Sequence, residues 1–370
     1  MTSYLHHLIE NSPSNLITYS EYIDAVLYHP QYGYYMKEKQ KIGREGDFLT
    51  TSNVSDIYGR IIAKWFSQLI RYCELPPVFC EVGAGNGRFA HAFLEEWRES
   101  VRTPLSYRIV ETSPYHRKLQ IELLQSEFDV DQYNSLLEVP SFEGVIFANE
   151  LFDALPVHVI EKEDGQLYEI MIGLNEGKLY EQRVLLENKT IQAFLQEAGL
   201  HLGNKQRIEI PLSMANMLKQ FAAVLTKGIV VTVDYGYSND EWMEPSKKNG
   251  SLRGYFQHQM VENVLLRPGE MDITSHVHFD SLRKKGEEFH LEFVAQLRQD
   301  EFLLKAGILE ELEEHYDANP FSAVSRRNRA IRSLIMSSGM SSTFHVMIQQ
   351  KHLNLKTEEE LFENVTKTLE

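Results

Sequence analysis

The chain has 370 residues, of which 43% are hydrophobic and 24% are charged, and its formal net charge is −16. This composition indicates a folded protein with enough apolar residues for a large core or two smaller ones. The acidic balance argues against nonspecific nucleic-acid binding, which needs Lys and Arg against phosphate, and it suits a basic partner.

The number of cysteines and the sequence of the N-terminus limit the possible metal chemistry and the expected location of the protein. Two cysteines, Cys73 and Cys80, are too few for a disulfide framework or a zinc site, so we expect no metal. The N-terminus lacks a basic segment followed by an apolar run, and no apolar stretch reaches the length of a membrane span. These features predict a cytoplasmic protein without membrane attachment.

Residues 1–76 are expected to form a helical and loop region that precedes the core. Residues 20–28 have helical periodicity, and Ser20 is a suitable N-cap. Residues 54–73 place apolar side chains on one face of a longer helix, which we interpret as core packing.

Residues 77–89, PVFCEVGAGNGRF, are the most informative stretch of the chain. An apolar strand ends in Glu81, glycines follow at Gly83, Gly85 and Gly87, and apolar residues then recur at helical spacing. Glycines allow positive φ and let the backbone approach a ligand closely, while a helix N-terminus presents free N–H groups. The pattern predicts the nucleotide-binding corner of an α/β sheet.

The details of this loop favour one nucleotide over others. A dinucleotide site needs a small residue where Arg88 stands, and a phosphate-binding Walker loop needs Gly-Lys-Ser/Thr. The Glu81 carboxylate would repel a diphosphate but attract an ammonium group. S-adenosylmethionine carries an ammonium and a sulfonium and no phosphate, so the loop favours it over NAD. The residues expected to contact it here are Glu81, Gly83, Ala84, Gly85 and Gly87.

Two further strands end in polar residues. The strand 107–111 ends in Glu111, whose carboxylate is expected to accept both ribose hydroxyls, the alternative being a surface carboxylate. The strand 142–150 ends in Asn149 and Glu150, where loops outside the carboxyl ends of strands meet ligand. The cofactor contacts expected from these ends are Glu111, Thr112, Asn149 and Glu150.

Two insertions are expected within the core region 77–350. The first, about 157–211, contains three short strands separated by Asp164-Gly165 and Glu176-Gly177 turns, which predicts an antiparallel addition. The core then resumes with a helix at 213–226 and a strand at 228–234.

The second insertion, about 235–290, begins with an irregular stretch rich in Gly, Pro, Ser and Lys. Long loops of this kind are usually functional or disordered, so we expect a lid over the cofactor. Its inner surface would carry Arg253, Tyr255 and His258. Residues 342–350 are expected to form a closing strand, and residues 351–370 a polar tail.

The segment Asn149–Val157, NELFDALPV, resembles the signature of the MidA-like methyltransferases, a family that includes a mitochondrial complex I assembly-factor protein arginine methyltransferase. The resemblance covers roughly residues 20 to 350, and the proline that ends the family's G-D-F-x-T-S-P block is replaced by Asn53. Other matching blocks occur in family order at 32–35, 46–52, 81–89, 234–237, 250–255 and 268–277.

The resemblance implies an α/β fold with a Rossmann-like seven-stranded methyltransferase sheet and helices on both faces. It implies S-adenosylmethionine as the cofactor and a protein arginine side chain as the methyl acceptor. It also implies that the block containing Thr51 and Ser52 closes over the cofactor, the alternative being a turn that caps the following helix.

Methyl transfer from a sulfonium is an in-line displacement that mainly needs positioning and exclusion of water. A guanidinium acceptor would be held by carboxylates, and Glu150, Asp153 and Asp234 are the candidates. Glu150 and Asp153 stand at i and i+3, so both would face the mouth of the pocket if a helical turn starts there. The alternatives are a cofactor contact for Glu150, a cap for Asp153 and a structural turn for Asp234. His276 and His278 alternate, which disfavours a shared metal and fits structural histidines.

The sequence therefore predicts an S-adenosylmethionine-dependent methyltransferase that acts on a protein arginine. The alternative is a cofactor-binding assembly module that serves a partner protein without essential turnover. A dehydrogenase is disfavoured by Arg88 in the loop. The oligomeric state stays open, with a homodimer as one option.

Overall fold

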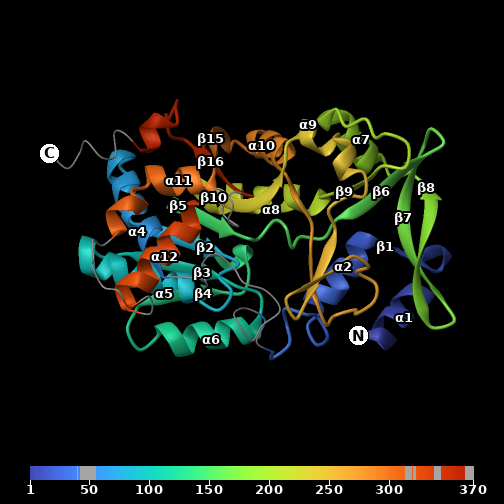
Figure 1. Ribbon diagram of the computed structural model, residues 1–370, viewed down its shortest axis with the longest axis horizontal. Coiled ribbons are helices and arrows are strands. Elements are labelled where there is room, and N and C mark those ends of the chain that lie inside the picture. The colour runs from blue at the N-terminus through green and yellow to red at the C-terminus, as the bar shows by residue number, and fades with distance from the viewer. Residues whose placement is uncertain (40, 42–55, 313–318, 320–321, 337–342, 363–370) are drawn as a thin grey trace. The chain divides into compact units, whose positions relative to one another are not determined.

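The computed structural model describes residues 1–39, 41, 56–312, 319, 322–336 and 343–362 (Figure 1). These residues form two compact units, each assembled from three separate segments of the chain. Unit 1 comprises Met1–Phe48, Phe152–Leu218 and Gly236–Lys285, and unit 2 comprises Leu49–Leu151, Lys219–Tyr235 and Gly286–Glu370. Most of the two expected insertions and the first 48 residues thus belong to one unit.

Unit 2 contains the expected seven-stranded sheet, in the order β15-β16-β10-β5-β2-β3-β4. The strands from β10 to β4 are parallel, while β16 runs antiparallel to both β10 and β15. The short strand β14 pairs with the last two residues of β10, which lie in unit 1. The seven strands are β2 (Val78–Val82), β3 (Ser106–Val110), β4 (Val130–Tyr133), β5 (Phe142–Asn149), β10 (Leu225–Tyr237), β15 (Glu292–Arg298) and β16 (Phe344–Lys351).

Both faces of this sheet are buried. Side chains alternate between the faces along a strand, so Phe79 and Val145 lie on one face and their neighbours Cys80 and Ile146 on the other. All four are fully buried, and Phe79 and Val145 belong to an apolar cluster with the helices of unit 2. The helices of this unit are α4 (Ile57–Tyr72), α5 (Arg88–Glu96), α6 (Pro114–Leu124), α11 (Gln299–Lys305) and α12 (Ala323–Ile335).

The strand order creates a switch point at the carboxyl ends of β2 and β5. From β2 the chain adds β3 and then β4 on one side, and it then returns to place β5 on the other side. The connections leave these two strand ends in opposite directions, which opens a crevice where α/β proteins bind ligands. Gly83 follows β2 and Glu150 follows β5, so the predicted site residues of both strands meet at this edge.

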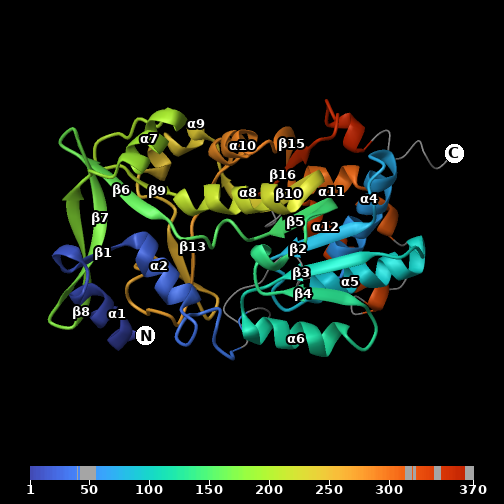
Figure 2. The same ribbon diagram turned by 180° about the vertical axis from the view of Figure 1, so that it is seen from behind.

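Unit 1 is built around two antiparallel sheets (Figure 2). In the larger sheet β7 pairs with β1, β6 and β8, and β9 pairs with β6. The three strands expected from the first insertion are confirmed, and both tight turns have positive φ at their two central residues. The larger sheet contains β1 (Leu16–Thr18), β6 (His158–Glu163), β7 (Gln166–Asn175), β8 (Lys178–Leu185) and β9 (Arg207–Ile210).

The remaining elements of unit 1 include the second sheet, in the order β12-β11-β13. Helix α8 (Leu212–Val224) and helix α10 (Phe279–Glu288) each contribute residues to both units. The other elements are α1 (Thr2–Glu10), α2 (Tyr19–Tyr28), α7 (Lys189–Ala198), α9 (Asn239–Trp242), β11 (Arg253–Phe256), β12 (Gln259–Val261), β13 (Asp272–Thr274) and β14 (Val277–His278).

Three local expectations need correction. The N-cap of α2 is Thr18 rather than Ser20, because the Thr18 hydroxyl accepts from Glu21 N–H while the Glu21 carboxylate accepts from Thr18 N–H. The stretch 235–275 is not irregular throughout, since it forms α9 and the second sheet, and its Ile273 is buried in the apolar core of unit 1. The tail contains buried Leu361, so its first part packs into the core of unit 2.

The structure also bears on the apolar stretches and on one of the two cysteines. Within the described residues, no helix combines the length and the apolar character that crossing a membrane would require. Cys80 lies inside β2 as expected, and burial raises the pKa of its thiol to about 12. A thiol with such a pKa stays protonated and behaves as a small apolar residue.

Candidate functional site

The glycine loop connects β2 to α5 with three left-handed residues. Gly83, Gly85 and Gly87 have φ of 79°, 54° and 81°. A Cβ on Gly83 would come within 3.1 Å of the Leu151 side chain, so the loop packs closely against the segment that follows β5. Ala84 is buried within the loop. The expected strand, turn and helix are confirmed, and the three glycines are required by backbone conformation.

Glu111 fastens this loop to the end of β3. One carboxylate oxygen accepts the Gly85 N–H at 2.9 Å, and the other accepts the Ser113 N–H at 2.8 Å. The carboxylate is almost fully buried, which excludes the alternative of a surface residue. Thr112, between Glu111 and Ser113 in the sequence, is exposed, and its carbonyl oxygen accepts a hydrogen bond from the Arg117 guanidinium. The carboxylate expected to bind a ribose therefore also determines the shape of the glycine loop.

Glu81 lies in β2 and is buried beneath the loop rather than exposed at its tip. Its carboxylate accepts the Tyr107 hydroxyl at 2.7 Å. Burial raises the pKa of Glu81 to about 8, and the neighbouring negative charge of Glu111 adds to this shift while the Tyr107 bond opposes it. The free protein therefore holds Glu81 mostly protonated at neutral pH, and a nearby ammonium group would favour its charged form.

The end of β5 carries the second group of predicted residues. The Asn149 amide oxygen accepts the Tyr58 hydroxyl at 3.2 Å, and its amide nitrogen donates to the Glu150 carboxylate at 3.1 Å. Glu150 has φ of 53°, a left-handed conformation that is unusual for a residue other than glycine. Its N–H donates to Val233 O at 2.9 Å, which ties the strand end to β10.

Asp234 lies beside this strand end but is completely buried. It follows Val233, which pairs with Asn149 in the parallel register of β5 and β10. One oxygen of its carboxylate accepts the Tyr235 N–H at 2.9 Å. This contact fits the alternative of a structural role, since the carboxylate satisfies the backbone of β10 just beyond its pairing with β5.

Asp153 belongs to unit 1, whereas Glu150 belongs to unit 2. No helical turn begins at Glu150, so the expected i, i+3 pairing of the two carboxylates on one helix face is wrong. Asp153 is buried. Burial raises the pKa of Tyr35 and Tyr255, and the negative charges of Asp272 and Asp153 add to both shifts. Its backbone oxygen accepts the Ser275 N–H at 2.9 Å.

The remaining predicted residues are placed as follows. Thr51 and Ser52 lie outside the described residues, as does most of the block 46–52. In β11, the Arg253 guanidinium donates to the carbonyl oxygen of Leu252 at 2.7 Å. His258 lies in the turn between β11 and β12, where its φ is 62°.

The two histidines pack within unit 1, in agreement with the expectation that they are structural. His276 stacks on Tyr237, and His278 stacks on Trp242 and contacts the Glu209 carbonyl oxygen at 2.8 Å. Burial lowers the pKa of His276 to about 4 and that of His278 to about 3, so both rings are neutral at neutral pH. Among the described residues, no group of three or more His, Cys, Asp or Glu side chains is arranged to hold a metal ion.

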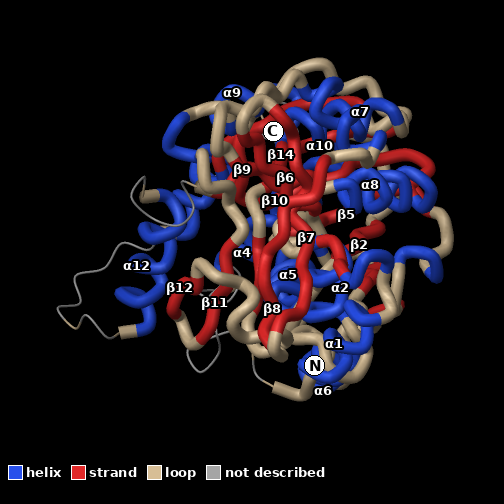
Figure 3. Tube along the Cα trace, turned by 90° about the vertical axis from the view of Figure 1, so that its right-hand side faces the viewer, coloured by secondary structure: helices blue, strands red, loops and turns tan. Residues whose placement is uncertain are grey.

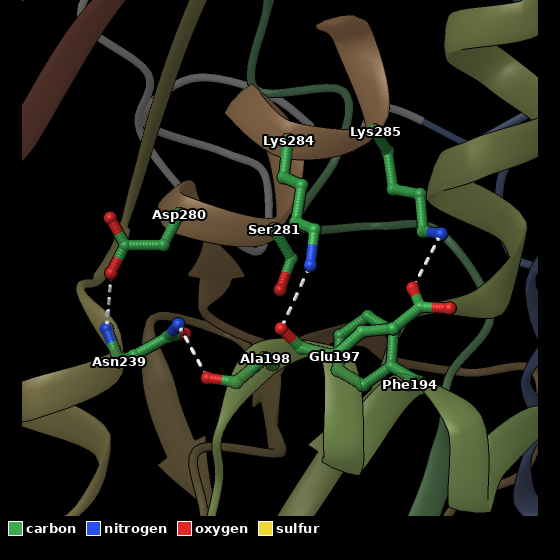
Figure 4. Close-up of a pocket in the computed structure, with 8 residues that line it drawn as sticks. All are labelled: Phe194, Glu197, Ala198, Asn239, Asp280, Ser281, Lys284 and Lys285. Atoms are coloured by element: carbon green, nitrogen blue, oxygen red, sulfur yellow. Dashed lines mark hydrogen bonds and ion pairs between the residues drawn. The ribbon is translucent and has the colours of Figure 1, made fainter. Parts of the chain in front are cut away.

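A cavity of about 140 Å³ lies in unit 1, and none of the residues that line it is a predicted site residue (Figure 4). Its polar side chains contact one another. Lys285 forms an ion pair with Glu197 at 2.8 Å, and Lys284 donates to the Glu197 carbonyl oxygen at 3.0 Å. The Asn239 N–H donates to the Asp280 carboxylate at 2.6 Å. These contacts explain the cavity lining as local structure and give no reason to place a ligand there.

Sequence analysis missed two polar residues of the site. The Gln120 side chain is fully buried, and its amide nitrogen donates to Gly85 O at 2.7 Å, so it holds the loop from the side of α6. Tyr58 is equally buried and contacts Asn149. By its spacing Tyr58 belongs to the apolar face of α4. Its hydroxyl is the one feature of the sequence that could have indicated a polar contact here, because a buried tyrosine hydroxyl needs a hydrogen-bond partner.

Comparison with known proteins identifies the chain. Residues 61–295, well over half of the chain, match the family model described as "Putative S-adenosyl-L-methionine-dependent methyltransferase". The chain belongs to this family. The resemblance drawn from the signature blocks and the choice of S-adenosylmethionine over NAD are both confirmed.

Curated relatives and a solved structure agree with this assignment. The protein arginine methyltransferase NDUFAF7 of mouse mitochondria is 26% identical and covers 96% of this chain and 86% of its own length. The fruit-fly homolog is 28% identical and covers 73% of this chain and 67% of its own. A COG1565 superfamily protein from Burkholderia thailandensis, crystallised with S-adenosylhomocysteine, is 25% identical with a TM-score of 0.88. That alignment covers 97% of this chain and 93% of the crystallised one.

These relatives correct one expectation. The curated methyltransferases are named as mitochondrial, so the prediction of a cytoplasmic location is wrong. That prediction was drawn from the absence of recognisable targeting signals, which is weak evidence about location.

The residues of the crevice fit the methyltransferase cofactor. The glycine loop has few side chains, so a ligand can approach its backbone closely. Glu111 at the end of β3 and Asn149 at the end of β5 supply hydrogen-bond acceptors and donors. Buried Glu81 can become a counter-charge for an ammonium group. The protein is an S-adenosylmethionine-dependent methyltransferase by its family, and the placement of its cofactor residues at the ends of β2, β3 and β5 stays a prediction.

Proposed function

We propose that the methyl acceptor is an arginine side chain of a protein, and that Glu150 is the carboxylate that binds it. The names of the curated relatives support an arginine acceptor, since both are called protein arginine methyltransferases. The net charge of −16 supports a basic partner through long-range attraction. Neither nucleic acid nor membrane is part of this proposal.

The conformation of Glu150 is the observation that carries the assignment. A left-handed backbone costs a residue with a Cβ about 1 kcal/mol, and such strain at a ligand crevice points to a functional constraint. The carboxylate is partly exposed and receives one hydrogen bond from Asn149. It also raises the pKa of Tyr58 through its charge, after the larger effect of burial, so a hydroxyl and a carboxylate lie close together at this strand end.

The position of Glu150 relates it to the cofactor loop. The next residue, Leu151, contacts the backbone of Gly83, so the segment carrying Glu150 packs on the first turn of that loop. A carboxylate here can accept two guanidinium N–H groups and orient the third nitrogen of the acceptor. The cofactor supplies an electrophilic methyl group, and the protein aligns the acceptor nitrogen and excludes water.

The bonds and charges that change in the reaction define what the Glu150 carboxylate has to stabilise. A bond forms between the acceptor nitrogen and the methyl carbon while the sulfur–carbon bond breaks, and the methylated guanidinium sheds one proton to solvent. The Glu150 carboxylate stabilises the positive charge of the acceptor before and after transfer. Asp234 holds the neighbouring end of β10 and acts as a positioning residue, because it is completely buried.

Asp153, Thr51 and Ser52 are further predicted site residues. The role of Asp153 in acceptor binding stays a prediction, supported by a buried carboxylate among tyrosines of unit 1. The role of Thr51 and Ser52 in closing over the cofactor stays a prediction from family resemblance.

The test uses protein extract from cells that lack this chain, incubated with purified enzyme and methyl-labelled cofactor. Mass spectrometry of the labelled proteins is expected to find methylarginine with the native enzyme and none with Glu150→Gln. A matched control is Glu143→Gln, an exposed position at the other end of β5, which is expected to leave labelling unchanged.

Two outcomes contradict the proposal. Label found only on residues other than arginine would exclude arginine as the methyl acceptor. Full labelling by Glu150→Gln would exclude a role for Glu150 in binding the acceptor. The assembly-module alternative predicts instead that Glu150→Gln complements a deletion strain completely, although it transfers no methyl groups.

A further inference from the structure

Strand β8 forms an open edge of the larger sheet in unit 1. It pairs with β7 along its whole length, and within the described residues it pairs with no other strand (Figures 1 and 3). Seven of its eight residues are exposed, and only Leu179 is partly covered. Open edges present unpaired backbone groups and are usually protected by bulges or prolines. The register between β7 and β8 shows no shift, and β8 contains no proline.

The backbone groups that face outward from β8 can be assigned. The Leu186 N–H donates to Leu167 O at 2.9 Å, directly after the last paired residue, Leu185. Hydrogen-bonded and non-hydrogen-bonded pairs alternate along an antiparallel ladder. The even-numbered residues of β8 therefore bond to β7, and the odd-numbered residues point their N–H and C=O groups away from the sheet. The outward-facing residues are Leu179, Glu181, Arg183 and Leu185.

The sequence of β8 is complementary to itself when two copies run antiparallel about Gln182. Glu181 of one copy then lies opposite Arg183 of the other, and Gln182 lies opposite Gln182. The same register places Tyr180 opposite Val184 and Leu179 opposite Leu185. Opposite charges and aromatic–aliphatic pairs that lie directly opposite one another stabilise antiparallel pairing. The pairs at odd numbers are those with outward backbone groups, so the register also satisfies the hydrogen-bond alternation.

Neighbouring registers lose this complementarity. Centring the pairing on Glu181 places two glutamates opposite each other, and centring it on Arg183 places two arginines opposite each other. Like charges directly opposite are destabilising. The charges of the strand itself thus disfavour both neighbouring registers.

The side chains of β8 are already arranged for such a contact. Glu181 accepts from Arg207 at 2.8 Å, and Arg183 contacts Glu163 at 3.0 Å, which fixes both charged groups on one face of the sheet. The Arg183 side chain remains 49% exposed. On the other face Tyr180 covers Gly173 and remains 39% exposed, and Val184, further along the same face, is 36% exposed. Pairing would bury this apolar surface and extend the charge network.

We propose that a second copy of this chain docks on β8, so that two copies form one continuous antiparallel sheet centred on Gln182. The interface is isologous, because the same strand serves both partners. It involves unit 1 alone and does not depend on the identity of the methyl acceptor. The contact is small for a stable complex, so the dimer forms in a concentration-dependent way.

The first test uses two charge-reversal variants of the full chain and sedimentation velocity over a wide range of concentration. Glu181→Arg places arginine opposite Arg183, and Arg183→Glu places glutamate opposite Glu181, so each variant alone is expected to stay monomeric. A mixture of the two restores both opposite-charge pairs and is expected to dimerise. Rescue in the mixture cannot arise from the ion pairs within one chain, which each substitution also breaks.

The second test uses cysteine cross-linking and remains informative if a charge variant folds poorly. A non-hydrogen-bonded antiparallel pair places its Cα atoms about 4.5 Å apart, within the reach of a disulfide. Gln182→Cys is therefore expected to form a disulfide-linked dimer under mild oxidation. Tyr180→Cys, which would face Val184, is the matched control and is expected to link far less.

Three results would overturn the proposal. The first is a native chain that remains monomeric at every concentration. The second is equal cross-linking of Gln182→Cys and Tyr180→Cys. The third is a mixture of the charge variants that does not dimerise although both variants are folded by circular dichroism. The first of these includes the case in which β8 binds a segment of another protein but does not self-associate.

Discussion

The Glu111 carboxylate accepts the backbone N–H of Gly85 at 2.9 Å, so the end of β3 fixes the cofactor loop that follows β2. The same carboxylate accepts the Ser113 N–H through its other oxygen. A single buried charge thus orders two chain segments before any ligand arrives, which reduces the ordering that binding has to supply.

Replacing Glu111 by Gln is expected to weaken both the fold and cofactor binding. Gln supplies one acceptor oxygen instead of two and leaves a buried N–H without a partner, which costs about 1–3 kcal/mol of unfolding free energy. Chemical denaturation with and without S-adenosylmethionine measures both effects. Glu122→Gln, at an exposed position on α6, is the matched control. Equal stability and equal cofactor protection in the two variants would remove Glu111 from the loop.

The raised pKa of Glu81 predicts a pH dependence of stability. The ordinary pKa of 4.5 applies to the unfolded chain, whereas burial raises the pKa to about 8 in the folded protein. Between these values the folded protein keeps a proton that the unfolded chain has released, so its unfolding free energy falls as pH rises. This loss is absent below pH 4.5 and complete above pH 8.

The measurement compares native protein with Glu81→Gln by denaturant unfolding from pH 5 to pH 8.5. Gln keeps an acceptor for the Tyr107 hydroxyl but has no proton to lose. The native protein is expected to lose about 1 kcal/mol per pH unit relative to the variant across this range. Parallel stability profiles would show that Glu81 titrates normally in the folded protein.

Glu150→Gln is expected to separate cofactor binding from transfer. The substitution keeps the size of the side chain and its bond to Asn149, so cofactor affinity should change little. Turnover should fall by about a hundredfold or more, since a neutral amide cannot balance the charge of a bound guanidinium. Calorimetry gives the affinity and a labelled-methyl assay gives the turnover. An unchanged rate, with Glu143→Gln as the matched control, would exclude Glu150 from the reaction.

The sheet and the cofactor loop were predictable because their signals are local. The glycines that need positive φ lie within five consecutive positions, and a polar residue stands within one position of the last residue of β2, β3 and β5. The position of Glu111 beside the glycine loop follows from the same pattern, because the carboxyl ends of parallel strands meet at one edge.

The composition of unit 1 was not predictable, because it depends on contacts between distant segments. Ile17 in the first segment, Ile172 in the second and Ile273 in the third share one core, and no periodicity within a segment reports this. The role of Gln120 was missed for the same reason, since its partner Gly85 lies 35 positions earlier. Asp153 was misplaced because a helical turn was assumed where the chain passes from unit 2 to unit 1.

The most direct test of the cofactor assignment is isothermal titration of the native protein, Gly85→Val and Gly165→Val with S-adenosylmethionine. Both glycines have positive φ, but Gly165 lies in a hairpin of unit 1 with open space around it. Saturable heat is predicted for the native protein and for Gly165→Val, and its loss is predicted for Gly85→Val. Equal heats in all three proteins, or no heat in the native one, would contradict the assignment of the cofactor to this loop.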